Sequence, residues 1–513
     1  MSKPRMLKGI MTVGFWTLLS RVLGMAREVL IFALIGAGPV LDAFIAAFRL
    51  PNMFRRFFAE GAFNAAFVPM FSKRLEADDR PSQFASQAMG GLATVLLILT
   101  GLAMIFMPAL VWATAEGFTG TDRFDLTVDY GRVMFPYILL ISLAALLSGA
   151  LNASGRFAMA AAAPVFLNIL IIIALSLAYF MGYEAIWFLV WTVPLAGVVQ
   201  LALVWYAAQK AGLNIKLGRP RWNAEMRTLV VVALPAALAN GVMQINLLVG
   251  QLVASQFPNA VSWLYGADRL YQLPLGVVGI AVGIVLLPDL SRRLQAGDDA
   301  GAKEAFSRAG EITFALTLPA AVALCIIPLP LVSALYEHGS TGRSDAEAMA
   351  LATAIYGLGL PAFVLQKLLQ PLYFAREDTK RPFRFAVISM IINAVCAVGL
   401  MPIFGWLAPA IATTVSAWAM IALLAIGTRR YGDVATFDSR MKSRLGRVIL
   451  ASLLMGLCLW IAQYSLAPFV TTTVLRVFFG LGLVIFGIGA FGVFGQMVGA
   501  IKLSELKATV RRT

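Results

Sequence analysis

The chain has 513 residues, of which 60% are hydrophobic and 13% are charged, and its net charge is +15. Soluble domains carry about 25% charged residues, so this composition excludes a soluble globular protein and indicates a polytopic membrane protein. The positive charge does not call for nucleic acid as a partner, because lysine and arginine also hold connections at the cytoplasmic face of a membrane.

Apolar runs of about 20 residues predict helices long enough to cross a hydrocarbon layer of about 30 Å. Fourteen such runs lie at residues 10–36, 42–70, 84–114, 127–151, 158–180, 184–208, 226–256, 260–289, 304–327, 346–371, 382–402, 405–429, 443–466 and 471–500. The first run resembles a signal peptide, but Arg21 interrupts it and no small-residue cleavage site follows, so we expect an uncleaved helix. The predicted fold is an all-α membrane protein of fourteen spanning helices.

Basic residues fall in every second connection between these runs. One side holds basic groups within residues 3–8, 73–80, 210–227, 292–303, 376–384, 429–447 and 502–512, and Arg156. The opposite connections hold only Arg123 and Arg343, each among acidic residues. Because lysine and arginine stay in the cytoplasm, both termini are predicted to be cytoplasmic.

Two halves of the chain resemble each other. Residues 67–75 (FVPMFSKRL) match residues 286–294 (LLPDLSRRL), and residues 47–50 (AFRL) match residues 267–270 (ADRL). Transporters often place the substrate path between such repeats. We therefore expect an N-terminal lobe over residues 1–215, a C-terminal lobe over 216–435, and two extra helices over 436–513 that fall outside the repeat and need another role.

The stretch from residue 20 to residue 60 combines apolar runs with many charges. A charged side chain at the centre of a membrane helix costs about 2.5–3.5 kcal/mol, so these side chains are expected to face a shared, water-filled interior. Arginine presents a flat fork of donors that suits phosphate or carboxylate. The candidate substrate-binding residues are Arg21, Arg27, Glu28, Asp42, Arg49, Arg55, Arg56 and Glu60, with Asp268 and Arg269 from the second half.

Two other interpretations of these charges remain open. The arginines can pair internally with Glu28, Asp42, Glu60 or Asp268, although arginines outnumber these acids. Arg55 and Arg56 can instead lie near the cytoplasmic end of their helix and extend to the membrane surface.

Residues that usually carry catalysis or bind metals are sparse. Three cysteines, Cys325, Cys396 and Cys458, lie in apolar runs without metal or redox spacing, and His338 is the single histidine. The sequence contains no Walker loop, HExxH motif or paired CxxC motif. We expect no enzymatic activity, no bound metal and no cofactor.

The motifs of the first helices resemble the mouse virulence factor family of lipid II flippases, within the MOP exporter superfamily. The resemblance covers essentially the whole chain and is carried by residues 20–24 (SRVLG), 42–44 (DAF), 49–52 (RLPN), 55–56 (RR), 58–63 (FAEGAF), 67–69 (FVP) and 267–270 (ADRL). It departs from the family at Glu28, where Asp is common, and at Arg49, where Lys can occur.

This resemblance implies two six-helix lobes around a cationic central cavity and a groove for an undecaprenyl tail between the last two helices. The family's essential cavity charges would fall on Arg21, Arg27, Asp42, Arg55 and Arg269. The implied partners are lipid II and membrane lipids, and cell-wall synthesis proteins are candidates. Some members hold sodium through carboxylates of the second lobe, but the runs 226–256, 382–402 and 405–429 contain no carboxylate, so sodium coupling is not expected.

The predicted function is therefore a flippase of the bacterial inner membrane. It would move lipid II from the cytoplasmic to the periplasmic leaflet by alternating access, driven by the membrane potential or an ion gradient. Three alternatives remain: a cation-coupled drug antiporter of the same superfamily, a flippase for another lipid-linked sugar such as O-antigen, and a membrane glycosyltransferase or phosphatase. An arginine-lined cavity disfavours cationic drugs, and the scarcity of metal ligands disfavours the enzymes.

Overall fold

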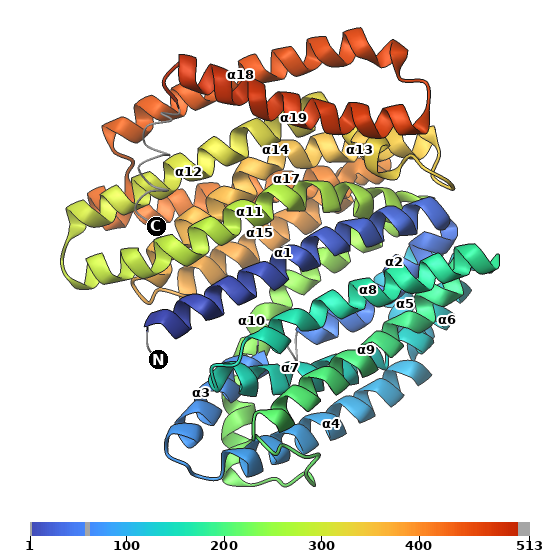
Figure 1. Cartoon of the computed structure of the whole chain (residues 1–513), viewed down its shortest axis with the longest axis vertical. Coiled ribbons are helices and arrows are strands. Elements are labelled where there is room, and N and C mark those ends of the chain that lie inside the picture. The colour runs from blue at the N-terminus through green and yellow to red at the C-terminus, as the bar shows by residue number, and fades with distance from the viewer. Residues whose placement is uncertain (1–2, 57–61, 501–513) are drawn as a thin grey trace. The chain divides into compact units, whose positions relative to one another are not determined.

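The computed structural model describes residues 3–56 and 62–500, and every regular element in these ranges is a helix (Figure 1). Contacts divide the chain into two compact units, Met1–Ser262 and Trp263–Thr513. The division falls inside one helix, α11 (Ala260–Gln295). It differs from the boundary near residue 215 expected from the repeat, and that repeat boundary remains a prediction.

The first unit consists of helices from the N-terminal half of the chain. They are α1 (Lys3–Leu34), α2 (Pro39–Arg55), α3 (Ala62–Glu76), α4 (Pro81–Ile105), α5 (Met107–Thr114), η2 (Glu116–Phe118), α6 (Asp122–Met134), α7 (Tyr137–Ala153), α8 (Ala158–Met181), α9 (Ala185–Lys210) and α10 (Ala224–Ser255). Gly36, at a φ of 83°, allows the chain to turn between α1 and α2, a conformation that residues with a Cβ rarely adopt.

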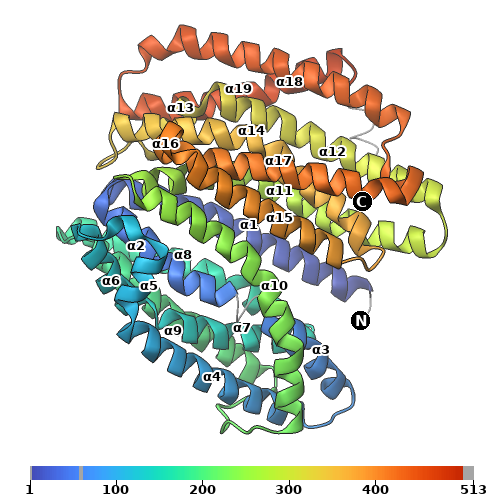
Figure 2. The ribbon, with the colours of Figure 1, turned by 180° about the vertical axis from the view of Figure 1, so that it is seen from behind.

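The second unit continues from α11. Its helices are α12 (Asp299–Ile326), α13 (Pro328–Tyr336), α14 (Arg343–Phe374), α15 (Lys380–Gly399), α16 (Met401–Phe404), η3 (Gly405–Leu407), α17 (Ala408–Thr428), η4 (Arg429–Ala435), α18 (Ser439–Leu466), η5 (Ala467–Phe469) and α19 (Thr473–Met497). Helices α18 and α19 pack against each other and run in opposite directions, as both views show (Figures 1 and 2).

A helix or a pair of helices lies at each of the fourteen predicted apolar runs. Among the described residues, ten helices are long and apolar enough to cross a membrane. The run 84–114 divides at Phe106 into α4 and α5, and the run 127–151 divides at Phe135 and Pro136 into α6 and α7. Each break lies next to a proline at the start of the following helix, where the missing N–H costs no helical hydrogen bond.

The two units share an order of packing. In the first unit α7 packs against α4 and α9, and α9 packs against α8. In the second unit α14 packs against α12 and α17, and α17 packs against α15. The predicted third to sixth helices therefore pack on one another in the same order as the predicted ninth to twelfth helices, and the internal repeat remains a prediction. Helices α18 and α19 pack against α12 and α13 of the second unit.

Candidate functional site

The first group of candidate residues lies on α1 and α8. Arg27 forms an ion pair with Glu28 and donates a hydrogen bond from Nη1 to Oδ1 of Asn168 over 2.8 Å. Asn168 donates from Nδ2 to the backbone oxygen of Ser20 over 2.9 Å. Glu28 is only 2% exposed, so its charge depends on the guanidinium beside it. The amide of Asn168 thus joins α8 to α1 and directs the arginine.

Part of the internal-pairing interpretation therefore describes a real contact. Arg27 and Glu28 pair directly, although the chain has more arginines than acids in this region. The pair does not exclude a substrate, because a guanidinium has five donors and a carboxylate occupies only some of them.

Asp42 lies at the start of α2 and is completely buried, at 0% exposed. Its Oδ1 accepts a hydrogen bond from the backbone N–H of Ser262 over 2.8 Å, and its Oδ2 lies 3.6 Å from Nη1 of Arg123. Arg123 in turn lies 4.5 Å from the ring centre of Phe118 and donates to the carbonyl oxygen of Phe257 over 3.3 Å. Asp42 therefore joins α2 to α6 and to the first turn of α11.

Arg123 is the residue that the sequence interpretation missed at this place. The sequence analysis names Arg123 only as an isolated basic residue in a connection between two predicted helices. No local signal pointed to Asp42, because Asp122 and Asp125 beside Arg123 offered nearer partners.

The remaining candidates of the first unit lie along α1 and α2. Arg49 donates from Nη1 to the carbonyl oxygen of Leu247 on α10 over 3.3 Å. Arg55 donates from Nε to Oδ1 of Asn52 over 3.3 Å. The side chains of Arg21 and Arg56 are exposed. Glu60 lies outside the described residues. The predicted stripe of Asp42, Arg49 and Arg56 thus contains members with different partners.

In the second unit, Asp268 and Arg269 are adjacent on α11. The guanidinium of Arg269 lies 4.4 Å from the ring centre of Tyr265, an arrangement that stabilises a cation by the negative face of the ring. Asp268 accepts a hydrogen bond from the side-chain amide of Gln272, one helical turn away. Both side chains are half-buried. The expected correspondence of Arg269 with Arg49 remains a prediction.

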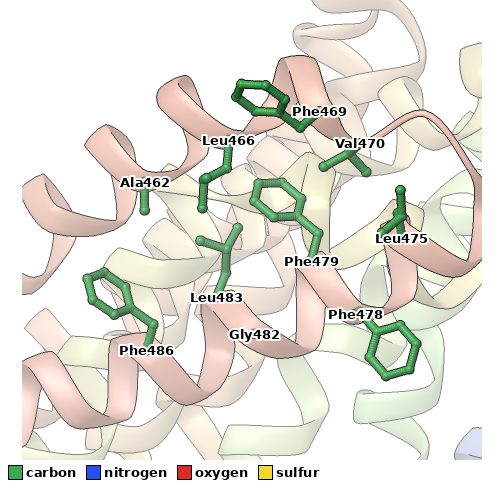
Figure 3. A pocket seen from close by; sticks show the side chains of 10 residues that line it. All are labelled: Ala462, Leu466, Phe469, Val470, Leu475, Phe478, Phe479, Gly482, Leu483 and Phe486. Atoms are coloured by element: carbon green, nitrogen blue, oxygen red, sulfur yellow. The ribbon is translucent and has the colours of Figure 1, made fainter.

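A groove opens between α18 and the first half of α19 (Figure 3). Its volume is about 530 Å³, within the range of ligand pockets in proteins. All ten lining residues lack charge, and four are phenylalanines: Phe469, Phe478, Phe479 and Phe486. Gly482 also lines the groove, and a Cβ at this position would meet no atom within 4 Å. The groove therefore suits a hydrocarbon chain.

The described residues contain no group of three or more His, Cys, Asp or Glu side chains that could hold a metal ion. The three cysteines are unpaired and half-buried in this structure. Two features of the described residues that can bind a ligand are the arginines with partly fixed directions and the apolar groove between α18 and α19.

Comparisons with known proteins identify similar sequences among lipid II flippases. The family model described as lipid II flippase MurJ matches residues 31–480. A probable lipid II flippase MurJ from Rhizobium tropici is 42% identical over 97% of this chain and 96% of its own length. The lipid II flippase MurJ of Burkholderia cenocepacia is 32% identical over 89% of this chain and 90% of its own.

Solved structures agree in fold. A lipid II flippase MurJ in an inward closed conformation superimposes with a TM-score of 0.80 at 24% identity, covering 94% of this chain and 98% of the other. An inward-facing multidrug resistance MATE transporter of the MOP superfamily gives a TM-score of 0.68 at 17% identity, covering 81% and 95%. This multi-pass membrane protein belongs to the lipid II flippase MurJ family.

Proposed function

We propose that this protein moves lipid II across the bacterial inner membrane, from the cytoplasmic to the periplasmic leaflet. The observation that carries the proposal is its similarity to flippases of that name over nearly the whole chain. The likeness to a MATE transporter concerns the fold alone and does not favour drug export. The substrate is carried without chemical change, so the protein supplies binding and movement rather than catalysis.

The headgroup would be held by arginines. A diphosphate offers paired oxygens, and charge-assisted, bidentate hydrogen bonds from guanidinium groups are the strong contacts available to it. Arg27 is already directed by Asn168 and Glu28, which lowers the cost of ordering its side chain when the ligand binds. Arg21, Arg49, Arg55, Arg56 and Arg269 would add positive charge, while Glu28 would orient Arg27, and Asp268 would balance the adjacent Arg269, when no substrate is bound. Asp42 would instead hold Arg123.

The lipid tail would occupy the groove between α18 and α19. An undecaprenyl chain has no polar group, and the groove lining has no charged residue. Van der Waals contacts with the lining side chains would hold the tail there, because a tail that leaves the surrounding lipid gains no hydrophobic free energy. The groove would thus hold the tail while the headgroup passes through the protein.

Transport would follow alternating access driven by the membrane potential or an ion gradient, with both termini in the cytoplasm. The support is the alternation of basic connections and the lack of an ATP-binding motif in the sequence. Proteins of cell-wall synthesis are the proposed partners.

Depletion of the protein in its bacterium tests this proposal. Lipid II should then accumulate in the cytoplasmic leaflet, where an externally added, membrane-impermeant enzyme cannot cleave its headgroup. Accumulation in the periplasmic leaflet would contradict the proposal, and export of cationic dyes lost on depletion, with normal lipid II distribution, would favour a drug antiporter.

A further inference from the structure

The connection between α9 and α10, residues 211–223, has a fixed backbone although it forms no helix. The N–H of Gly218 donates to the carbonyl oxygen of Ser86 on α4 over 3.1 Å, and the N–H of Lys216 donates to Oγ of Ser86 over 3.0 Å. A Cβ on Gly90 would overlap the carbonyl oxygen of Gly218, so only glycine permits this approach. The connection is therefore a surface of defined shape.

This surface carries a concentrated positive charge, which we call the basic patch. Its members are the exposed side chains of Lys210, Lys216, Arg219, Arg221 and Arg227. The single acid between residues 210 and 231 is Glu225, and Arg74 of α3 forms an ion pair with it over 2.8 Å. The basic patch thus attracts an anion from outside the protein.

A cavity of about 720 Å³ adjoins the basic patch, and its lining is both polar and apolar. Trp222, which is 75% exposed, lies on one side of it, and Arg227 and Val231 line it from α10. Arg227, Val231 and Leu234 are spaced by four and three residues, so they follow one face of that helix. Val231 and Leu234 are both exposed.

Cations and a tryptophan in the connection and the first turn of α10 are therefore followed by aliphatic side chains further along α10. A phospholipid likewise has its phosphate and glycerol at one end and its acyl chains at the other. Tryptophan is enriched at the level of the headgroups, and clusters of basic residues next to a membrane helix attract anionic lipids. An acidic segment of another protein would form ion pairs with the cations, but it would offer no apolar group to the exposed Val231 and Leu234.

We propose that the basic patch and its cavity bind the headgroup of an anionic phospholipid, such as phosphatidylglycerol, in the cytoplasmic leaflet. Arg221 and Arg227 contact the phosphate, Trp222 lies at the glycerol, and an acyl chain follows Val231 and Leu234. The lipid fastens the connection between α9 and α10 to the membrane surface. This binding requires neither lipid II nor transport, so it can be tested separately from the proposed function.

The test uses the full chain, purified in a non-ionic detergent and titrated with dihexanoyl phosphatidylglycerol or dihexanoyl phosphatidylcholine. Native mass spectrometry counts the bound lipid. One variant combines Arg219→Gln, Arg221→Gln and Arg227→Gln. The matched control combines Lys380→Gln, Arg384→Gln and Arg429→Gln, which removes three exposed cations from the other unit. Thermal unfolding of both variants verifies that they are folded.

We expect the unaltered chain to prefer phosphatidylglycerol, and each arginine removed to weaken that binding about fivefold. The triple variant should lose about a hundredfold in affinity, the product of three fivefold losses, while the control changes little. Trp222→Ala should weaken both lipids. If the triple variant does not fold, Arg227→Gln alone should weaken phosphatidylglycerol binding about fivefold while Arg384→Gln changes it little, and equal losses in the two would overturn the proposal.

Three results would overturn the proposal. The first is equal loss in the triple variant and its control, which would reflect overall charge. The second is equal affinity for glycerol phosphate and phosphatidylglycerol, which would exclude a role for the apolar side chains. The third is binding of a polyglutamate peptide, with the same dependence on the arginines, in the absence of lipid binding, which would indicate an acidic protein partner.

Discussion

Arg27 of α1 donates a hydrogen bond to Asn168 of α8 over 2.8 Å, and the same amide donates to the backbone of Ser20 over 2.9 Å. One buried side chain therefore fixes both the position of α1 on α8 and the direction of the guanidinium. If Arg27 binds the diphosphate of lipid II, Asn168 acts as a positioning residue for it.

Asn168→Ala should reduce lipid II flipping by about tenfold or more while the amount of protein stays near normal. A hydrogen bond to a charged group contributes about 1.5–3 kcal/mol, which sets this range. The control is Asn393→Ala, a buried asparagine of α15 in the second unit, whose amide donates to the hydroxyls of Thr413 and Ser416. A loss of flipping that is as large for Asn393→Ala would contradict the positioning role.

Substitutions of Arg27 distinguish a residue that binds substrate from one that only pairs with Glu28. If it holds a diphosphate, Arg27→Lys should impair flipping, because lysine lacks the planar fork, and Arg27→Ala should abolish it at normal abundance. If it only neutralises Glu28, Lys should be nearly silent, and Arg27→Ala should strand a buried acid at a cost of about 3–5 kcal/mol and lower the abundance.

Flipping and protein level should be measured for Arg27→Lys, Arg27→Ala and the double change Arg27→Ala with Glu28→Ala. The same set applies to Arg269 and Asp268 of the second unit. Rescue of flipping by a double change would argue against a diphosphate contact at that position.

The helices could be predicted from the sequence, whereas the contacts of Asn168 could not. Long apolar runs and the alternation of basic connections predict membrane helices because each depends only on local composition. The contacts of Asn168 with Arg27 and of Arg123 with Asp42 join residues more than 80 positions apart, so no local pattern indicates them. The apolar groove was predicted only from family resemblance and from two helices outside the repeat.

Gly482 offers a test of that groove. Gly482→Leu would place a branched side chain in open space among the lining phenylalanines and should exclude part of the lipid tail. Gly489→Leu on the same helix is the control, because a Cβ there also meets no atom within 4 Å and the residue does not line the groove.

Binding of lipid II with its full tail should weaken for Gly482→Leu and not for Gly489→Leu. A short-tailed analogue with the same headgroup should bind both variants as it binds the unaltered chain. Equal binding of full-length lipid II by all three proteins would show that the groove does not hold the tail.

The orientation in the membrane is tested by single cysteines in a chain whose native cysteines are replaced by serine. Cysteine at the exposed Gly342 should react with an impermeant thiol reagent in whole cells, and cysteine at the exposed Leu217 should react only after lysis. Leu217 is preferable to the adjacent Gly218, where a Cβ would lie 2.6 Å from the backbone oxygen of Ser86. The reverse labelling would overturn the predicted orientation.

The central claim is that this chain alone carries lipid II across a bilayer. Its direct measurement uses sealed vesicles that contain the purified chain and fluorescent lipid II, with an impermeant reductant added outside to bleach the accessible leaflet. We predict that lipid II from the inner leaflet becomes bleached over time, and that vesicles with Arg27→Ala behave like protein-free vesicles. Bleaching that stops at the outer leaflet in all three, under an imposed membrane potential or ion gradient, would contradict the account.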